Sequence, residues 1–321
     1  MQLPKDNEIL LVGGSSIAED YLAVLTALKI KPIVVCRTEE SAKRFKKATN
    51  YNIYSGGVER IIDHQTFSGT TAIVAVNIDN LSKVTKKLIS SGCKKILVEK
   101  PAGISSEEIL DIKELAEIHK SKVLIAYNRR FYESTRKAKE IILNDGGIRS
   151  FRFEFTEWSH VIQNLNSSQI IKERWFLSNS SHVVDLAFFL GGQPKEISSY
   201  ISGQGELEWH PSSSVFSGSG KTINNKLFSY HADWNGPGRW GVELVTGKHR
   251  LILSPMEKLQ MQKIGSVGVD FVDLDDNFDR SFKPGFYKQL EAFVNNQFDD
   301  FCTIEEQNQA LKYYKKISGY K

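Results

Sequence analysis

A glycine-containing turn near the start of the chain has residue types that suit phosphate binding. Residues 12–18, Val-Gly-Gly-Ser-Ser-Ile-Ala, lie between a short apolar run and a segment with apolar residues at helical spacing. Glycine lets the backbone turn tightly there and approach a pyrophosphate, while the helix N-terminus supplies N–H donors and positive potential. In the pattern G-x-G-x-x-G, Gly13 matches, Ser15 takes the second glycine position and Ala18 the third. We expect a dinucleotide to bind here through Gly13, Gly14, Ser15, Ser16 and Ile17.

A lysine stands just beyond another apolar run. Residues 96–98, Ile-Leu-Val, are typical of a buried strand, and Glu99-Lys100-Pro101 follows them directly. Ligands of open parallel sheets bind at the carboxyl ends of the strands, and the proline keeps Lys100 extended so that its side chain can point toward such a ligand. We therefore count Glu99 and Lys100 in the candidate cofactor site, together with Val76 at the end of a third apolar run. By itself, a lysine at a strand end is usually a surface lysine.

The end of the second strand distinguishes between two cofactors. Enzymes that use NAD usually have an acidic residue there to bind the ribose hydroxyls, but this chain has Cys36-Arg37-Thr38. Arg37 can pair with the 2′-phosphate of NADP and Thr38 can donate to it. We therefore expect NADP, while the nearby Glu39 keeps NAD open as the alternative. Alternatively, Arg37 is a solvated loop residue with no role in cofactor binding.

Short apolar runs alternate with helical patterns in the first part of the chain. Continuous apolar strands separated by helices predict a parallel sheet that is covered on both faces. We expect an α/β Rossmann domain over residues 1–125. Its predicted strands are 9–12, 32–36, 71–76, 96–98 and 123–125, and its predicted helices are 17–28, 80–90 and 105–119, the last opened by a capping signal at residues 105–108.

The pattern changes after residue 125. Residues 151–158 alternate between apolar and polar side chains, which indicates an antiparallel strand, and residues 161–171 are polar and predict a loop. We expect residues 126–321 to form an α+β domain with a large, mostly antiparallel sheet that binds substrate. Further strands are predicted at 196–202, 226–234, 240–246, 249–253 and 257–263, and helices at 134–144, 182–190, 285–297 and 304–317.

Composition narrows the function classes. Charged residues make up 25% of the 321 residues, and the net charge of +4 is too small and too evenly spread to indicate nucleic acid. Cys36, Cys93 and Cys302 match no metal or redox spacing, so we expect reduced thiols, no metal site and a cytoplasmic location. The polar N-terminus predicts no signal peptide. No apolar stretch approaches the ~18 residues that span a membrane.

Five motifs follow one another along nearly the whole chain. They are the turn Gly13–Ala18 followed by Tyr21, Glu99-Lys100-Pro101, Tyr127-Asn128-Arg129-Arg130-Phe131, Ser181-His182-Val183-Val184-Asp185 and Lys283-Pro284-Gly285-Phe286-Tyr287. In this order they resemble the motifs of the Gfo/Idh/MocA oxidoreductases, the family of glucose-fructose oxidoreductase and inositol dehydrogenase.

The resemblance implies hydride transfer between a nicotinamide and a sugar carbon that bears a hydroxyl or carbonyl oxygen. By the same resemblance, Lys100 and His182 are the candidates that move the proton of that oxygen. Lysine, with an ordinary pKa of ~10.4, acts as a base near neutrality only beside a cation or when buried, and otherwise polarises the oxygen as an ammonium. Asp185 lies on the same helix face and can orient His182. Helix capping remains the alternative role for His182 and Asp185.

One position departs from the family pattern. Many members carry an aspartate four residues before this histidine, where the present chain has Ser178. Either Lys100 and His182 suffice, or another residue such as His160 substitutes, or hydride transfer is impaired.

For the substrate side, we expect Arg129, Trp158, Lys172 and Arg174 to contribute, because they combine cations with an aromatic ring in and near these motifs. The resemblance favours a nucleotide-linked sugar of polysaccharide biosynthesis, with arginines on its diphosphate. Because an open sheet in the second domain would risk aggregation unless it is covered, we expect a second subunit to cover it in a homodimer or homotetramer. We expect neither nucleic acid nor membrane as a partner. Two alternatives remain: a catalytically impaired dinucleotide- or sugar-nucleotide-binding sensor or scaffold, and a reductase of a non-sugar substrate.

Overall fold

The structure is a computed structural model that describes residues 9–62 and 70–320. The chain divides into two compact units. Unit 1 contains Met1–Tyr127 and Ser281–Gln309, and unit 2 contains Asn128–Arg280 and Ala310–Lys321. The change after Tyr127 lies close to the expected boundary at residue 125, but residues 281–309 belong to unit 1 rather than to the second domain.

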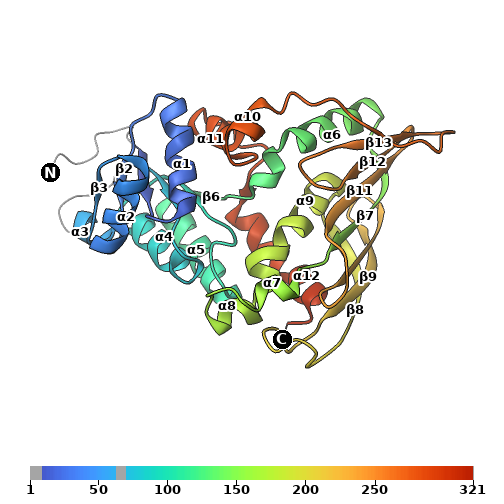
Figure 1. The fold of residues 1–321 in the computed structure, drawn as a ribbon, viewed down its shortest axis with the longest axis horizontal. Helices are drawn as coiled ribbons and strands as arrows, with labels where there is room; N and C mark the ends of the chain where they lie inside the picture. The colour runs from blue at the N-terminus through green and yellow to red at the C-terminus, as the bar shows by residue number, and fades with distance from the viewer. Residues whose placement is uncertain (1–8, 63–69, 321) are drawn as a thin grey trace. The chain divides into compact units, whose positions relative to one another are not determined.

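Unit 1 is built on a parallel sheet (Figure 1). Among the described residues its strand order is β15-β6-β5-β4-β1-β2-β3, and only β15 runs antiparallel to its neighbour. The strands are β1 (Ile9–Val12), β2 (Ile33–Val35), β3 (Ile53–Tyr54), β4 (Thr71–Val74), β5 (Lys95–Val98), β6 (Lys122–Ile125) and β15 (Cys302–Thr303). The fold class predicted for this half is confirmed.

Helices connect these strands and bury them. Every residue of β1 is buried, as a central parallel strand covered on both faces requires. The Ser105 hydroxyl accepts a hydrogen bond from the Glu108 backbone N–H at 3.2 Å, as the capping signal predicted. The helices are α1 (Ser16–Ala27), α2 (Glu39–Thr49), α3 (Glu59–Ile62), α4 (Leu81–Ser90) and α5 (Ser106–His119), of which α2 and α3 were not predicted.

The segment that returns to unit 1 completes it on two sides. In α11 (Phe286–Val294), the Phe286 ring lies 4.7 Å from the ring of Tyr21 on α1. At the sheet edge, β15 pairs Cys302 with Ile125 of β6. These contacts join residues far apart in the sequence, so local patterns did not reveal that residues 281–309 belong here.

Unit 2 contains an eight-stranded sheet in the order β14-β13-β12-β11-β7-β10-β9-β8 among the described residues. Strands β7 and β10 pair in parallel, and all other neighbours are antiparallel, which confirms the expected mostly antiparallel sheet. The strands are β7 (Ile148–Phe155), β8 (Pro194–Ser202), β9 (Val215–Thr222), β10 (Leu227–Asp233), β11 (Trp240–Thr246), β12 (His249–Leu253), β13 (Gln260–Lys263) and β14 (Asp270–Phe271).

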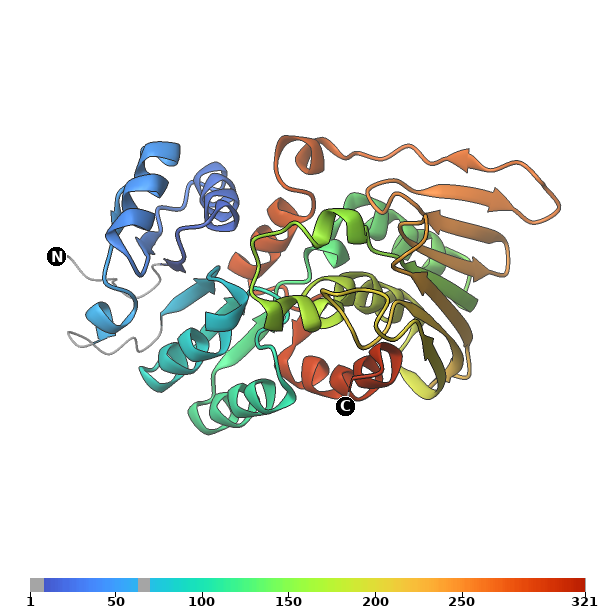
Figure 2. The same ribbon diagram turned by 60° about the horizontal axis from the view of Figure 1, so that its bottom comes forward.

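The two faces of this sheet differ in polarity. Phe151, Phe153 and Phe155 alternate along β7 and are buried on the face that packs against α9 (Ser181–Gly191) and α6 (Glu133–Asn144) (Figures 1 and 2). The opposite face carries the exposed ion pair of Arg152 and Glu243, whose charged atoms lie 2.6 Å apart. The period-2 alternation of the sequence therefore corresponds to one buried and one open face.

The polar segment 161–171 is not entirely a loop. It is flanked by α7 (Ser159–Ile162) and α8 (Gln169–Glu173), and a π-helix, η3 (Phe176–Ser180), leads directly into α9. The loop prediction was wrong where these short helices form, because the Ser159 hydroxyl donates to the Trp234 backbone carbonyl and holds α7 through a long-range contact. In the described part of the chain, no helix combines the length and apolarity needed to cross a membrane.

Candidate functional site

The glycine turn lies where β1 ends in unit 1. Gly13 has φ +147°, and its backbone N–H donates to the Val35 carbonyl at 2.8 Å. A Cβ at this position would lie 2.2 Å from the carbonyl oxygen of Ala75, far inside van der Waals contact. Only glycine therefore fits, which supports the predicted role of this residue in bringing backbone to a ligand.

A cleft of about 390 Å³ opens beside this turn. It lies at the carboxyl ends of β1, β2 and β4, the edge at which ligands of such sheets bind. Its lining comprises Val12, Gly13, Gly14, Ser15, Cys36, Arg37, Thr38, Ser41, Arg44, Gly57, Val58, Glu59, Ala75, Val76, Asn77, Asn80, Lys83 and Val84.

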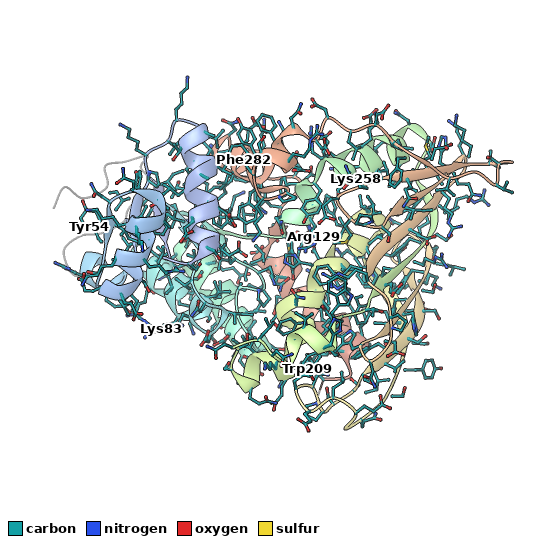
Figure 3. All side chains as sticks on the ribbon, viewed as in Figure 1. Tyr54, Lys83, Arg129, Trp209, Lys258 and Phe282 are labelled. Atoms are coloured by element: carbon teal, nitrogen blue, oxygen red, sulfur yellow. The ribbon has the colours of Figure 1, made fainter. Side chains whose placement is uncertain are left out.

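Cations outnumber anions on the cleft wall. Among the described residues, Arg37, Arg44 and Lys83 line it with one carboxylate, Glu59. Figure 3 labels Lys83 of these. That carboxylate accepts a hydrogen bond from the Lys87 ammonium at 2.6 Å, which lowers the pKa of Glu59 despite its partial desolvation. The cleft therefore has an excess of positive charge, which suits a phosphorylated ligand.

Six predicted cofactor residues line the cleft, while others occupy the surrounding elements. Ser16 and Ile17 form the first turn of α1, and Ser15 precedes it as the N-cap residue. The Thr38 hydroxyl caps α2 by accepting from the Ser41 backbone N–H at 3.2 Å, so it is already engaged. The six lining residues are Gly13, Gly14, Ser15, Arg37, Thr38 and Val76.

Arg44 was missed by the sequence reasoning. Its guanidinium donates to the carbonyl oxygen of Gly14, within the glycine turn itself. It stands on α2, which was not predicted, so no pattern indicated which way the side chain would face.

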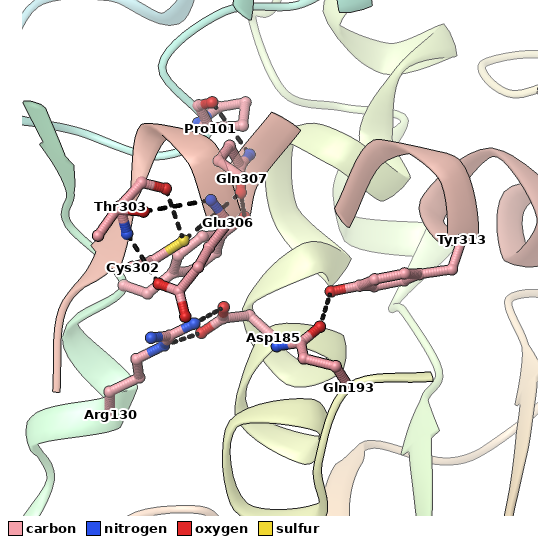
Figure 4. A network of polar contacts seen from close by, with 10 residues as sticks. Pro101, Arg130, Asp185, Gln193, Cys302, Thr303, Glu306, Gln307 and Tyr313 are labelled. Atoms are coloured by element: carbon pink, nitrogen blue, oxygen red, sulfur yellow. Dashed lines mark hydrogen bonds and ion pairs between the residues drawn. The ribbon is translucent and has the colours of Figure 1, made fainter. Parts of the chain in front are cut away.

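The turn that carries Lys100 is held by backbone and side-chain hydrogen bonds. The Glu99 N–H donates to the Val74 carbonyl at 2.9 Å, and the Ala102 N–H donates to the Glu99 carbonyl at 3.0 Å. The Gln307 side-chain amide donates to the Pro101 carbonyl at 3.1 Å (Figure 4). Lys100 itself is half-buried. These contacts fix the backbone on either side of the lysine.

Glu99 is paired with an aromatic hydroxyl. The Tyr21 hydroxyl donates to Glu99 Oε1 at 2.7 Å. Desolvation raises the pKa of Glu99, while the Tyr21 hydrogen bond and the charges of Lys100 and Lys283 oppose that rise. Desolvation, followed by the charge of Glu99, raises the pKa of Tyr21 well above its ordinary value. The Tyr21 hydroxyl therefore holds the Glu99 carboxylate by a hydrogen bond, next to the candidate lysine in the sequence.

In unit 2, His182 and Asp185 are both buried on α9. The His182 ring lies 6.3 Å from the Trp240 ring, centroid to centroid. Asp185 accepts two hydrogen bonds from the Arg130 guanidinium, at 2.9 and 2.6 Å (Figure 4). This bidentate buried pair gives Asp185 a charged partner in Arg130, and the orientation of His182 by Asp185 stays a prediction.

A buried carboxylate that the sequence reasoning did not select lies close to the start of α9. Glu157 is 2% exposed, and its Oε1 accepts hydrogen bonds from Ser180 Oγ at 2.7 Å and Asn179 Nδ2 at 3.0 Å. Desolvation raises the pKa of Glu157, against the effects of Ser180, Arg239 and Asn179. Glu157 therefore joins the end of β7 to the turn immediately before His182.

Four other candidates take separate positions in unit 2. The Ser178 hydroxyl donates to the Trp175 carbonyl at 3.3 Å, and His160 is exposed on α7. Lys172 donates to the Gln163 carbonyl at 2.9 Å, and the Arg174 guanidinium lies 5.0 Å from the Tyr320 ring centroid. In these hydrogen bonds and ring contacts, Lys172 and Arg174 touch neither Arg129 nor Trp158.

Metal ligands do not gather anywhere in the two described stretches, 9–62 and 70–320. No group of three or more His, Cys, Asp and Glu side chains is placed to hold an ion there. Cys36, Cys93 and Cys302 are buried and form no disulfide bonds.

The whole fold is similar to those of solved oxidoreductases. A protein of Desulfitobacterium hafniense named as an NADPH-dependent oxidoreductase is 17% identical, with a TM-score of 0.80 over 98% of this chain and 95% of that one. Levoglucosan dehydrogenase in complex with NADH and L-sorbose is 15% identical, with a TM-score of 0.78 over 97% and 95%. UDP-N-acetylglucosamine 3-dehydrogenase of Acidithiobacillus ferrooxidans is 13% identical, with a TM-score of 0.75 over 97% and 96%. No protein-family model and no curated sequence matches the chain.

The buried pair of Asp185 and Arg130 yields a stability prediction. Asp185→Asn leaves the Arg130 charge buried without its carboxylate, so we expect the free energy of unfolding to fall by about 3–5 kcal/mol. Urea denaturation measures this loss. As a control, Lys137→Ala removes the exposed pair with Glu140 and should cost less than about 1 kcal/mol. Equal losses in the two variants would contradict a structural role for the buried pair.

Proposed function

We propose that the protein is an NAD(P)-dependent oxidoreductase that transfers a hydride between nicotinamide and a sugar carbon. The observation that carries this proposal is the cationic cleft beside Gly13, at the carboxyl edge of a parallel sheet. The fold supports it, because proteins with the same architecture include dehydrogenases of levoglucosan and of UDP-N-acetylglucosamine.

The chain has residues suited to each part of a dinucleotide. The turn Gly13–Ser15 and the N-terminus of α1 suit the pyrophosphate, because no side chain intervenes at Gly13 and the first helical N–H groups are donors. Val76 lies in the cleft wall, and Glu99 stands beside Lys100 at the end of the neighbouring strand. When bound, the nicotinamide supplies the hydride acceptor or donor.

Lys100 and His182 are the proposed proton-handling residues. Lys100 binds the reacting oxygen of the sugar, and its ammonium stabilises negative charge that develops there. His182 takes up or returns the hydroxyl proton. Asp185 contributes indirectly in this proposal, since its bidentate contact with Arg130 anchors the helix that carries His182.

For the cofactor we propose NADP in preference to NAD. Arg37 lies in the cleft wall at the end of β2, Arg44 reaches the glycine turn, and no acid occupies residues 36–38. Two guanidinium groups suit the 2′-phosphate that distinguishes NADP. Glu39 is the next acid along the chain, and the Ser55 hydroxyl donates to it.

Substitution of Arg37 tests this choice. In Arg37→Ser, we expect NADPH to bind at least about tenfold more weakly while NADH affinity stays unchanged, since a charged hydrogen bond contributes about 1.5–3 kcal/mol. Fluorescence titration of each reduced cofactor gives the dissociation constants. Lys47→Ser, an exposed cation of α2 outside the cleft lining, is the control. Tighter binding of NADH than NADPH by the unsubstituted protein would exclude the NADP preference.

Substitution of Lys100 tests the chemistry. We expect Lys100→Ala to lower kcat by at least about 100-fold, because the reacting oxygen loses its charged partner. The thermal stabilisation by cofactor should persist in this variant. Turnover is followed by NAD(P)H absorbance with free sugars and nucleotide sugars, and the exposed Lys31→Ala serves as control.

Two results would change the functional proposal. Unaltered turnover in Lys100→Ala would remove that residue from the mechanism. Cofactor binding by the unsubstituted protein without hydride transfer to any sugar tested would instead favour a dinucleotide-binding sensor or scaffold. Ser15 in the phosphate turn and Ser178 before His182 are the features that agree with this second function.

For the substrate we propose a nucleotide-linked sugar of polysaccharide biosynthesis, acted on in the cytoplasm. UDP-N-acetylglucosamine 3-dehydrogenase shares the fold, which supports a substrate of this class. Arg129, Trp158, Lys172 and Arg174 stay candidates for its binding. Of these, Arg129 and Trp158 belong to one cluster in unit 2 through their contacts with Trp240 and Arg239.

We also propose that the open face of the eight-stranded sheet packs against a second copy of the chain, in a dimer or tetramer. Leu227 and Val245 on this face are 62% and 36% exposed. Analytical ultracentrifugation should show an oligomer at micromolar concentration, and Leu227→Glu with Val245→Glu should dissociate it, because two charges would be buried. Ile118→Glu, at a 74% exposed position of α5, should leave the oligomer intact. A monomeric unsubstituted protein would rule out this interface.

A further inference from the structure

An arginine of unit 2 has a donor that nothing in the structure satisfies. Arg129 belongs to η2 (Asn128–Phe131), and its Nε atom is out of contact with solvent and has no hydrogen-bond partner within residues 9–62 and 70–320. Its guanidinium carbon lies 4.7 Å from the Trp240 ring centroid and 5.9 Å from that of Tyr132. A buried cationic donor without an acceptor costs free energy, so this position suits an anionic ligand.

A second arginine contacts the same tryptophan. The Arg239 guanidinium carbon lies 4.8 Å from the Trp240 ring centroid and 4.5 Å from that of Trp158. The loop that carries Arg239 is fixed, because Trp158 Nε1 donates to the Gly238 carbonyl at 3.1 Å. Two guanidinium groups are therefore held on one indole ring, and Arg239 remains 48% exposed.

The nearby acids do not balance these charges. Glu157 Oε2 is 3.8 Å from Arg239 Nη1, a long ion pair, and the same carboxylate accepts hydrogen bonds from Asn179 and Ser180. Glu257 also acts on Arg129 electrostatically, but it is exposed to solvent. Burial lowers the pKa of the Arg129 guanidinium, and the charge of Arg239 lowers it further. Within the cluster, two cations share one buried anion, Glu157, because solvent screens the exposed Glu257. The buried donors of the cluster can therefore still take an anionic ligand.

We infer that Arg129 and Arg239, held by Trp240 and Glu157, form a binding site for an anionic group on the sugar substrate. The site takes a carboxylate of the sugar ring or a phosphate ester on the sugar, because both present paired oxygens to guanidinium donors. Trp240 also contacts the His182 ring, so the anionic group binds beside the proposed proton-handling histidine. This inference rests on the proposed function, since it specifies the sugar that function acts on.

Ligand binding without turnover tests the site independently of hydride transfer. Isothermal titration calorimetry of the full-length protein, without cofactor, compares glucuronate, glucose 1-phosphate and glucose. We expect at least one anionic sugar to bind tenfold or more tightly than glucose. Tighter binding of glucuronate identifies the ring carboxylate, and tighter binding of glucose 1-phosphate identifies the phosphate ester.

Substitutions then assign the binding to these arginines. Arg239→Gln and Arg129→Gln should each weaken binding of the anionic sugar at least tenfold and leave that of glucose unchanged. Arg136→Gln is the matched control, because Arg136 lies in the same unit with a 47% exposed side chain and pairs only with Glu133 of its own helix among its described contacts. Circular dichroism verifies that each variant is folded.

Three results would overturn the inference. The first is equal affinity for glucose and both anionic sugars, and the second is unchanged anion affinity in folded Arg239→Gln. The third is equal weakening in Arg136→Gln, which would indicate a general charge effect. Any of these three results would remove the proposed anion site. If the protein still turned over uncharged sugars, the oxidoreductase proposal would stand. Binding of the anionic sugar without turnover of any sugar would instead support the anion site and contradict the oxidoreductase proposal.

Discussion

The close approach of Gly13 to the Ala75 carbonyl is the constraint on which the candidate cofactor cleft depends. Because no Cβ fits between them, the backbone leaves β1 directly against the end of β4 and enters α1 within three residues. The helix N-terminus therefore faces the carboxyl edge of the sheet, and the cations of the neighbouring segments surround it. Positive charge and backbone donors at one edge are the features that make the cleft suitable for the phosphates of the proposed cofactor.

The lysine turn depends on residues from the far end of the chain. Gln307 donates to the Pro101 carbonyl and accepts from the Tyr127 hydroxyl at 3.2 Å, so it bridges the turn and the end of the parallel sheet. Tyr21, packed against Phe286, holds Glu99. Residues 281–309 thus pack within unit 1, and they also help to hold the turn that carries Lys100.

Unit 2 contains two arginines that are adjacent in sequence and differ in how their charge is compensated. Arg130 meets Asp185 with two hydrogen bonds in a buried pair, which is complete without a ligand. Arg129 instead lies against Trp240, and its Nε has no hydrogen-bond partner in the part of the chain that the structure describes. A satisfied pair is explained by the stability of the fold, whereas an unsatisfied cation calls for an acceptor from outside the chain. This difference separates a structural residue from a candidate binding residue.

The sequence alone determined the elements whose signals are local. Apolar runs bounded by glycine predicted β1 and α1, the serine cap predicted the start of α5, and period-2 alternation predicted β7. Only the tertiary structure decided that residues 281–309 join unit 1, that Arg44 reaches the glycine turn and that Glu157 lies against Asn179 and Ser180. Local periodicity specifies which face of an element is buried, but the partner of a polar side chain depends on contacts between segments distant in the chain.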